Sequence, residues 1–317
     1  MLNDETRAKA VECLSRGGLV AVPTETVYGL AADASNELAV RRIFAAKGRP
    51  STHPLIVHVA GLDALEGWVR EVPDVARRLA EAFWPGPLSL VLLRGPRASD
   101  AVTGGQDTVA VRVPDHPLTL ELLRAFGGGL AAPSANRFGR VSPTTAEHVR
   151  EELGDAVDLV LDGGPCRVGL ESTILDLTGE RPEVLRPGGI TLDALAEVLG
   201  HPVTVRQGGT VRVSGTLDSH YAPRAGVQLC EPSALEASLS EAHVRGLRTV
   251  VLSPARPVGA EDWLFLPEDP QEAAPLIYAR LREVDELGAA LALVSLPSPE
   301  GLGVAVRDRL RRAAAPR

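Results

Sequence analysis

The sequence is poor in cysteine and in long apolar runs. Cys13, Cys166 and Cys230 are its only cysteines, odd in number and far apart. This argues against a disulfide framework and against a zinc site, and it fits a reducing cytosol. Nor does any apolar run approach the ~20 residues that span a bilayer. We therefore expect a cytoplasmic protein with no protein metal site and no membrane partner.

The common nucleotide-binding and hydrolytic signatures are also missing. The chain contains no G-x-x-x-x-G-K-[ST] loop, no strand-linked G-x-G-x-x-G, no H-E-x-x-H and no G-x-S-x-G. Nucleotide use would need a site of another design. The net charge is -8, so the overall charge does not indicate a protein that coats a polyanion. Aromatic residues make up only 3% of the chain, which disfavours stacking on single strands.

What remains is the composition of a globular α/β protein. Its 317 residues, 44% hydrophobic and 23% charged, suffice for two domains. Apolar strand-like runs mixed with helical segments predict one α/β domain over residues 1–205. Residues 206–225 are rich in Gly, Ser, Thr and Arg without a period, which predicts a linker. In residues 226–317, strand-like runs and helical segments alternate again, which predicts a small doubly wound domain.

Local patterns predict individual elements. Residues 62–69, 145–153 and 272–287 read as helices, the second of them capped by Thr144. Residues 19–22 read as a buried strand, and we expect residues 23–30 to form a loop at its carboxyl end.

Polar side chains gather where predicted strands end. Pro23 stops the first strand, and three hydroxyl residues and Glu25 follow within residues 24–28. Lys47 and Arg49 come after the next helical run. Ligands of open α/β sheets usually lie at such strand ends. Hydroxyl groups beside a Lys/Arg pair suit a small polar ligand with a carboxylate or phosphates.

Taken singly, the other polar positions have ordinary structural explanations. Ser142 reads equally as an N-cap, His58 as a buried core histidine and Arg186 as a surface arginine. Because at least six such segments follow apolar runs of one domain, together they predict a cleft for a small anionic ligand. The residues alone do not define the reaction.

Eight motifs, in order, carry a resemblance to a known family. They are PTETVYGL (23–30), KGRP (47–50), PLIVH (54–58), WPGPL (84–88), VRVP (111–114), SAN (134–136), ESTI (171–174) and LRPG (185–188). With them the chain resembles the YrdC-like family. HYAP (220–223) and the C-terminal domain resemble its long, two-domain threonylcarbamoyl-AMP synthase form. The resemblance implies an α/β fold with a twisted mixed sheet flanked by helices, plus a small Rossmann-like C-terminal domain.

The resemblance also implies a reaction. L-Threonine, bicarbonate and ATP, carried with Mg²⁺, would give threonylcarbamoyl-AMP and pyrophosphate. Partner proteins would then transfer the threonylcarbamoyl group to position 37 of ANN-decoding tRNAs, so tRNA would be an indirect partner.

Site residues follow from the resemblance, motif by motif. Catalytic roles would fall to Lys47 and Arg49. Threonine would be held by Thr26, His58, Arg112, Ala132 and Ser172. ATP would be held by Arg49, His53, Thr108, Ser134, Asn136, Ser142, Arg186 and Tyr221, the last from a linker that acts as a lid. His53 stands where the family often has Asn.

Two alternatives stay open. One is a carbamoyltransferase of related fold, although those normally bring zinc-finger and acylphosphatase modules that this chain lacks. The other is a non-catalytic protein that binds double-stranded RNA or tRNA in a basic cleft. Threonine-dependent pyrophosphate release separates the synthase from the RNA-binding protein.

Overall fold

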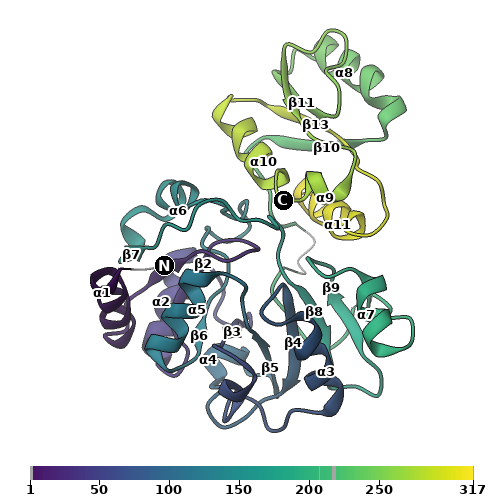
Figure 1. The fold of residues 1–317 in the computed structure, drawn as a ribbon. Coiled ribbons are helices and arrows are strands. Elements are labelled where there is room, and N and C mark those ends of the chain that lie inside the picture. Colours follow the sequence, from purple (N-terminus) through teal and green to yellow (C-terminus); the bar gives the residue numbers. More distant parts are fainter. Residues whose placement is uncertain (1–2, 207, 216–218, 317) are drawn as a thin grey trace. The chain divides into compact units, whose positions relative to one another are not determined.

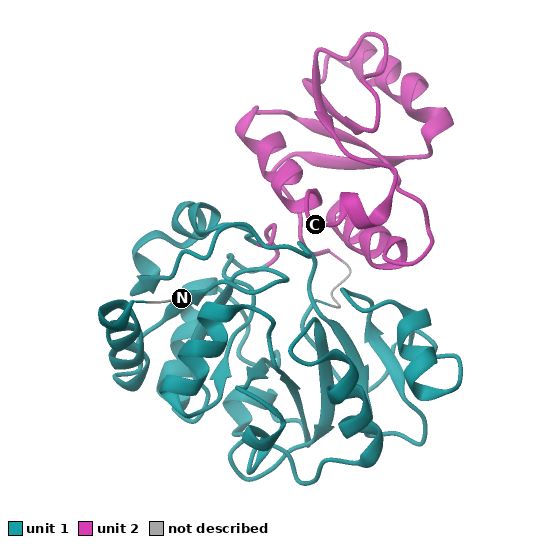
Figure 2. Cartoon of the chain, in the orientation of Figure 1, with its two compact units in different colours: residues 1–138, 143–216 teal, residues 139–142, 217–317 magenta. Residues whose placement is uncertain are grey.

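The structure is a computed structural model that describes residues 3–206, 208–215 and 219–316 (Figure 1). The linker positions 207 and 216–218 therefore lie outside the described residues. The chain forms two compact units, residues 1–138 with 143–216 and residues 139–142 with 217–317 (Figure 2).

Within the described residues, the first unit is built on a nine-stranded mixed sheet of order β7-β1-β2-β6-β3-β5-β4-β8-β9. Its strands are β1 (Val20–Val22), β2 (Gly29–Asp33), β3 (Ile56–His58), β4 (Leu88–Leu93), β5 (Thr108–Arg112), β6 (Leu130–Ala131), β7 (Leu159–Val160), β8 (Thr173–Asp176) and β9 (Glu183–Arg186). β3 is parallel to β5 and β4 to β8, whereas β4 and β5 are antiparallel. The carboxyl ends of β3 and β5 thus lie at the same sheet edge as the amino ends of β4 and β8.

Helices flank this sheet. They are α1 (Asp4–Ser15), α2 (Glu37–Lys47), η1 (Leu62–Leu65), α3 (Asp74–Phe83), α4 (Asp100–Thr103), α5 (Pro117–Phe126), α6 (Ala146–Leu153), η2 (Gly154–Ala156) and α7 (Leu192–Leu199). Side chains alternate between the two faces of a strand. In β1, Ala21 joins the core with α2, α3 and α7, while Val20 and Val22 join a second core with α1 and α5. The predicted mixed sheet flanked by helices is confirmed.

The second face continues over the other half of the sheet. Ile56, Val91, Ala110, Ile174 and Leu185 form a small apolar cluster there, against which the linker residues Val211 and Val213 pack. Ile56 and Ala110 are neighbours in the parallel pair β3–β5. This half of the face carries the candidate site.

The second unit holds a fully parallel sheet of order β10-β13-β11-β12. Its elements are β10 (Gly226–Cys230), η3 (Pro232–Ala234), α8 (Leu235–Val244), β11 (Thr249–Ser253), β12 (Asp262–Phe265), α9 (Pro270–Ala273), α10 (Ile277–Glu286), β13 (Leu291–Ser295) and α11 (Gly303–Ala314). Helices lie between β10 and β11 and between β12 and β13, as expected for the small Rossmann-like domain that the resemblance implies.

Helix α10 fixes two separate stretches of chain within this unit. The Asp285 carboxylate accepts hydrogen bonds from the backbone N–H groups of Arg224 (2.6 Å) and Ala225 (3.1 Å), and it pairs with Arg140 at 3.2 Å. Arg282 donates to the carbonyl oxygen of Val141. Residues 139–142 and the end of the linker are thereby held on one helix.

Four local expectations need correction. Gly29 and Leu30, expected in the loop of residues 23–30, belong to β2 instead, because they pair antiparallel with β1. Residues 62–69 form only the short η1, and Gly67 with φ 77° departs from helical geometry. The cap of α6 is Thr145, whose hydroxyl accepts from the His148 N–H at 3.2 Å. Residues 272–287 do not form the single helix that was expected. Pro275 separates α9 from α10, because proline lacks an N–H and clashes with the preceding turn.

Candidate active site

Strand alternation places four predicted residues on one face of the sheet. Ala110 belongs to the apolar cluster, so Thr108 and Arg112, two positions away on either side, share its face. His58 is paired with Arg112 and lies two residues beyond Ile56. Ser172 lies two residues before Ile174 of the apolar cluster and therefore shares its face. Predicted polar residues therefore flank the apolar cluster of Ile56, Val91, Ala110, Ile174 and Leu185, which we call the apolar floor.

The site is elongated rather than gathered at one sheet edge. His58 and Arg112 lie at the carboxyl ends of β3 and β5, and Ser172 immediately precedes β8. Thr108 begins β5 and lies at the other end of the strand, roughly 13 Å from Arg112 at 3.3 Å per residue. The residues that the resemblance assigns therefore do not all lie at a single edge of the sheet.

Arg112 is held by groups from two loops. Its Nη2 donates to Glu25 Oε1 at 2.6 Å, and its Nε donates to the carbonyl oxygen of Gly86 at 3.2 Å. Both charged side chains are almost fully buried, at 4% and 1% exposure. Glu25 Oε2 also accepts from the Asp115 N–H at 3.0 Å. The guanidinium thus has a fixed orientation at the strand end.

The loop of residues 23–28 is organised by Thr24. Its hydroxyl lies 2.8 Å from that of Thr26 and donates to the carbonyl oxygen of Val27 at 2.6 Å. It also accepts from the N–H groups of Thr26 and Val27. This side-chain-to-backbone pattern explains why the loop is ordered and buried.

His58 is buried in a neutral form. Burial, reinforced by the neighbouring Arg112 charge, lowers its pKa to about 3. Its Nδ1 is buried and has no hydrogen-bond partner within the described part of the chain. A neutral imidazole at this position can donate a hydrogen bond to a ligand through one ring nitrogen or accept one through the other.

Ser172 links the two ends of the site. Its hydroxyl lies 2.8 Å from that of Ser89 on β4, and its carbonyl oxygen accepts from Arg186 Nη2 at 2.8 Å. Arg186 Nη1 donates to the carbonyl oxygen of Ser214 in the linker at 2.9 Å. Arg186 is therefore a buried residue of the site rather than a surface arginine.

Lys47 supports a neighbouring loop. It is the last residue of α2, is 2% exposed, and donates to the carbonyl oxygens of Ser134 and Asn136. Burial lowers the pKa of Lys47 well below its usual value, and the nearby charge of Arg49 acts in the same direction. The bonds hold the SAN segment against the end of α2.

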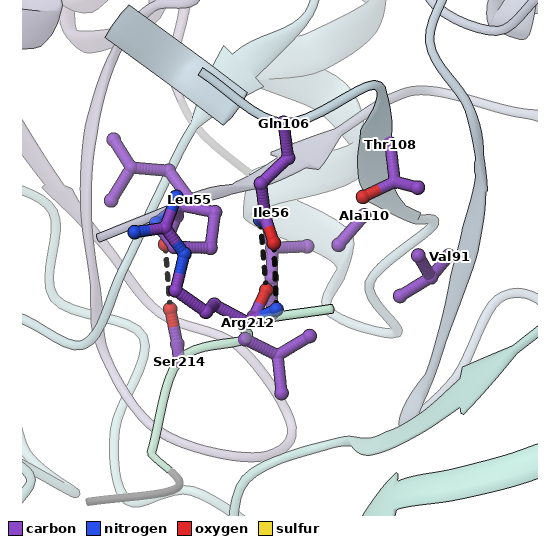
Figure 3. A pocket seen from close by; sticks show the side chains of 10 residues that line it. Leu55, Ile56, Val91, Gln106, Thr108, Ala110, Arg212 and Ser214 are labelled. Carbon is purple, nitrogen blue, oxygen red and sulfur yellow. Dashed lines mark hydrogen bonds between the residues drawn. The ribbon is translucent and has the colours of Figure 1, made fainter. Parts of the chain in front are cut away.

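Linker residues cover the other end of the apolar floor (Figure 3). Arg49 Nη2 donates to the Ser214 hydroxyl at 2.9 Å, and that hydroxyl donates to the carbonyl oxygen of Pro54 at 3.0 Å. Gln106 forms two hydrogen bonds with the backbone of Arg212. The remaining cavity measures only 10 Å³ and is lined in part by Thr108, which is about the size of one water molecule.

The other predicted residues lie in several places. The His53 ring contacts that of Phe138 edge-on with centroids 5.4 Å apart, and burial lowers its pKa. Ala132 packs in the core with α1 and α5. Ser142 and Tyr221 belong to the second unit. Tyr221 has φ 60°, is 1% exposed and stacks on Tyr278 at 5.6 Å.

Sequence reasoning missed three members of this arrangement. Ser89 interrupts the buried run Leu88–Leu93, and that polar interruption was a usable signal. Gln106 and Ser214 lie in irregular segments with no periodic signal. Nothing in their spacing indicated that they meet across the site.

In residues 3–206, 208–215 and 219–316, no three His, Cys, Asp or Glu side chains are grouped as metal ligands would be. Over the same ranges, no helix combines the length and apolar character needed to cross a membrane.

Fold and site together define a two-unit α/β protein with a buried arginine-lined face. A family model described as "Telomere recombination" (Sua5, YciO and YrdC) matches residues 12–188. A second, described as "Threonylcarbamoyl-AMP synthase, C-terminal domain", matches residues 190–315. The chain belongs to the Sua5–YciO–YrdC family.

Within that family the chain is similar to long-form relatives. A threonylcarbamoyl-AMP synthase of Pyrococcus abyssi is 40% identical over 311 residues, 95% of this chain and 91% of the relative. One from Bacillus subtilis is 40% identical over 325 residues, 98% of this chain and 94% of the relative.

Solved structures agree with this grouping. The crystal structure of P. abyssi Sua5 complexed with L-threonine has a TM-score of 0.94 and 38% identity, covering 99% of this chain and 95% of that one. Full-length HypF, with a TM-score of 0.53 and 20% identity over 59% of this chain and 30% of its own, shares the fold alone.

Proposed function

We propose that this chain joins L-threonine, bicarbonate and ATP to give threonylcarbamoyl-AMP, pyrophosphate and water. The relatives named above carry this activity in their names, and one of them was crystallised with L-threonine. The observation in this chain that carries the proposal is the buried Arg112 beside His58 and Ser172, on a face that continues to Arg49 and Arg186.

Threonine would bind at the Arg112 end of this face. The Nη1–Nη2 side of the guanidinium makes no hydrogen bond to the described residues apart from the single Glu25 contact through Nη2. A carboxylate fits that side as a two-pronged acceptor. Thr26, His58 and Ser172 surround it with hydroxyl groups and a neutral imidazole, and Ala132 completes the apolar side.

ATP would bind at the other end, where Arg49, Arg186 and Thr108 lie, with His53, Ser134 and Asn136 as further contacts. A cavity of 10 Å³ cannot hold a nucleotide, because ligand sites measure about 300–1,000 Å³. Residues 211–214 would therefore leave the apolar floor when ATP enters, and residues 206–225 would act as a movable linker between domains 1–205 and 226–317.

The chemistry requires charge neutralisation. The threonine amine adds to carbon dioxide or bicarbonate, and the carbamate oxygen then attacks the α-phosphorus while pyrophosphate leaves. Because anions meet in both steps, Arg49 and Arg186 would offset the repulsion together with the Mg²⁺ that accompanies ATP. Lys47, which holds two carbonyl groups, would act by fixing the SAN segment. Water exclusion would protect the labile carbamate.

The product is a mixed anhydride, so an acceptor must take up its threonylcarbamoyl group. We propose transfer proteins and tRNA as downstream partners, in the cytoplasm. Nothing in this role requires the chain itself to hold tRNA.

Pyrophosphate release tests the proposal. We expect release only when L-threonine, bicarbonate and Mg·ATP are all present, and we expect Arg112→Ala to lose this threonine-dependent release. Glu81→Gln, at an exposed position of α3, is the matched surface control. Release that proceeds equally without threonine would contradict the proposal.

A further inference from the structure

A carboxylate that the proposed function does not use lies directly behind Arg112. Glu25 has an exposed side-chain fraction of 1%, and both of its oxygens are engaged. Oε1 accepts from Arg112 Nη2 at 2.6 Å and Oε2 accepts from the Asp115 N–H at 3.0 Å. Its backbone carbonyl accepts from the Val168 N–H at 2.7 Å. Three chain segments are thus tied together through one residue.

These contacts occupy the Nε–Nη2 edge of the Arg112 guanidinium and leave its Nη1–Nη2 edge to face a ligand. Glu25 and the Gly86 carbonyl use Nη2 and Nε, which form one edge of the planar group. Guanidinium donors have a fixed fork geometry, so fixing one edge also fixes the direction of the Nη1–Nη2 edge. A side chain held in this way does not need to be ordered when the ligand arrives.

We propose that Glu25 is a positioning residue that aims the Nη1–Nη2 edge of Arg112 at the carboxylate of the amino-acid substrate. The proposal rests on the proposed function, in which Arg112 binds that carboxylate. Glu25 does not touch substrate; it acts through the orientation of Arg112.

Charge and geometry predict opposite results when Glu25 becomes glutamine. Removing the negative charge makes the surroundings of Arg112 more positive, which by itself strengthens binding of an anion. Glutamine, however, offers one acceptor oxygen to two donors. Either Arg112 Nη2 or the Asp115 N–H then faces an NH₂ group, and the guanidinium loses its fixed direction. Weaker threonine binding by the Glu25→Gln variant would therefore indicate that Glu25 acts by orienting Arg112 and not through its charge.

The experiment measures L-threonine binding by calorimetry and the KM values for threonine and ATP, in the full-length chain. For Glu25→Gln we expect the dissociation constant and KM for threonine to rise at least about tenfold, as a lost oriented contact to a charged group does. The KM for ATP should stay within about twofold. Glu81→Gln, an exposed change of the same chemistry, should leave all three values unchanged.

A second ligand separates positioning from a merely structural role. L-Threoninamide lacks the carboxylate, so the ratio of threonine to threoninamide affinity reports the contacts to that carboxylate, of which Arg112 supplies the charged one. Glu25→Gln should reduce this ratio at least about fivefold, whereas general loosening of the loop would weaken both ligands alike. Glu25→Asp keeps the charge but is one methylene too short to reach both donors. It should give an intermediate ratio, and it serves as the test variant if the glutamine variant does not fold.

The outcomes separate this proposal from the proposed function. Unchanged or tighter threonine binding in Glu25→Gln, or an unchanged ratio, overturns the positioning role while the synthase reaction stands. Absence of threonine binding in the unaltered chain, with and without Mg·ATP, overturns both.

Discussion

At the scale of single residues, the site combines cations that support the chain with cations that face the apolar floor. Lys47 donates to two backbone carbonyl oxygens, whereas Arg49 contacts a side-chain hydroxyl and one carbonyl. Although KGRP reads as one basic motif, its two cations have different environments. Substitutions should therefore separate a role in stability from a role in binding.

We expect Lys47→Met to lower the free energy of unfolding by about 2–4 kcal/mol, because it leaves two buried carbonyl groups without their donor. Arg49→Met should change stability less and should weaken binding of a non-hydrolysable ATP analogue by at least about tenfold. Urea unfolding and calorimetry on both variants check this. Equal stability of the two variants would contradict a supporting role for Lys47.

The buried histidine gives the stability of the first unit a pH dependence. Burial and the neighbouring Arg112 charge lower the pKa of His58 from its ordinary value of 6.5 to about 3. Below pH 6.5 the unfolded chain therefore binds a proton that the folded chain does not. Stability is fully present above that pH and is lost as the pH falls toward 3, at up to about 1.4 kcal/mol per pH unit.

Urea unfolding between pH 6.5 and 4.5 should show this slope, and His58→Gln should reduce it. The part that remains belongs to His53 and His116, whose pKa values burial also lowers. His201→Gln, at an exposed position of the same unit, serves as control. Trp68 and Trp84 report on the first unit if Trp263, the third tryptophan, is changed to Phe. The same slope in His58→Gln and in the unaltered chain would show that His58 titrates normally.

At the scale of elements, the linker segment and the apolar floor form one small core. Val211 and Val213 pack on Ile56, Val91, Ala110 and their neighbours, and Gln106 binds the backbone between the two valines. If the nucleotide displaces this segment, packing of the valines opposes nucleotide binding.

Replacing both valines with serine should therefore strengthen binding of a non-hydrolysable ATP analogue several-fold, since each half-buried valine contributes on the order of 1 kcal/mol. The segment should also become more sensitive to limited proteolysis. Val244→Ser with Val258→Ser, at positions 89% and 88% exposed, is the matched control pair. Weaker nucleotide binding would instead mean that the valines line the nucleotide site.

Element prediction succeeded where the periodic pattern was strong. The predicted strand at residues 19–22 and helix at residues 145–153 match β1 and α6 to within one residue at each end. It missed β2 because Gly29, Ala31 and Ala32 carry no β-branched signal, and the strand is specified by its pairing with β1. The motifs indicated site residues, yet their spacing could not show that Arg112 of β5 and Ser172, which precedes β8, lie on either side of β4. That depends on strand order, which is a tertiary property.

At the scale of the whole molecule, the chain combines an arginine-lined sheet face with a linker whose Val211 and Val213 pack on that face. The parallel second unit holds the far end of the linker through Asp285 of α10. This arrangement fits a reaction that must admit a nucleotide and then exclude water. The central claim is that carbon from bicarbonate becomes part of an adenylate of threonine.

Mass spectrometry with ¹³C-bicarbonate tests this claim most directly. The full-length chain, incubated with L-threonine, Mg·ATP and the labelled salt, should form an adenylate that contains threonine and one ¹³C atom. Pyrophosphate should appear in equal amount. An unlabelled threonyl-adenylate, or no threonine adduct of AMP, would contradict the account.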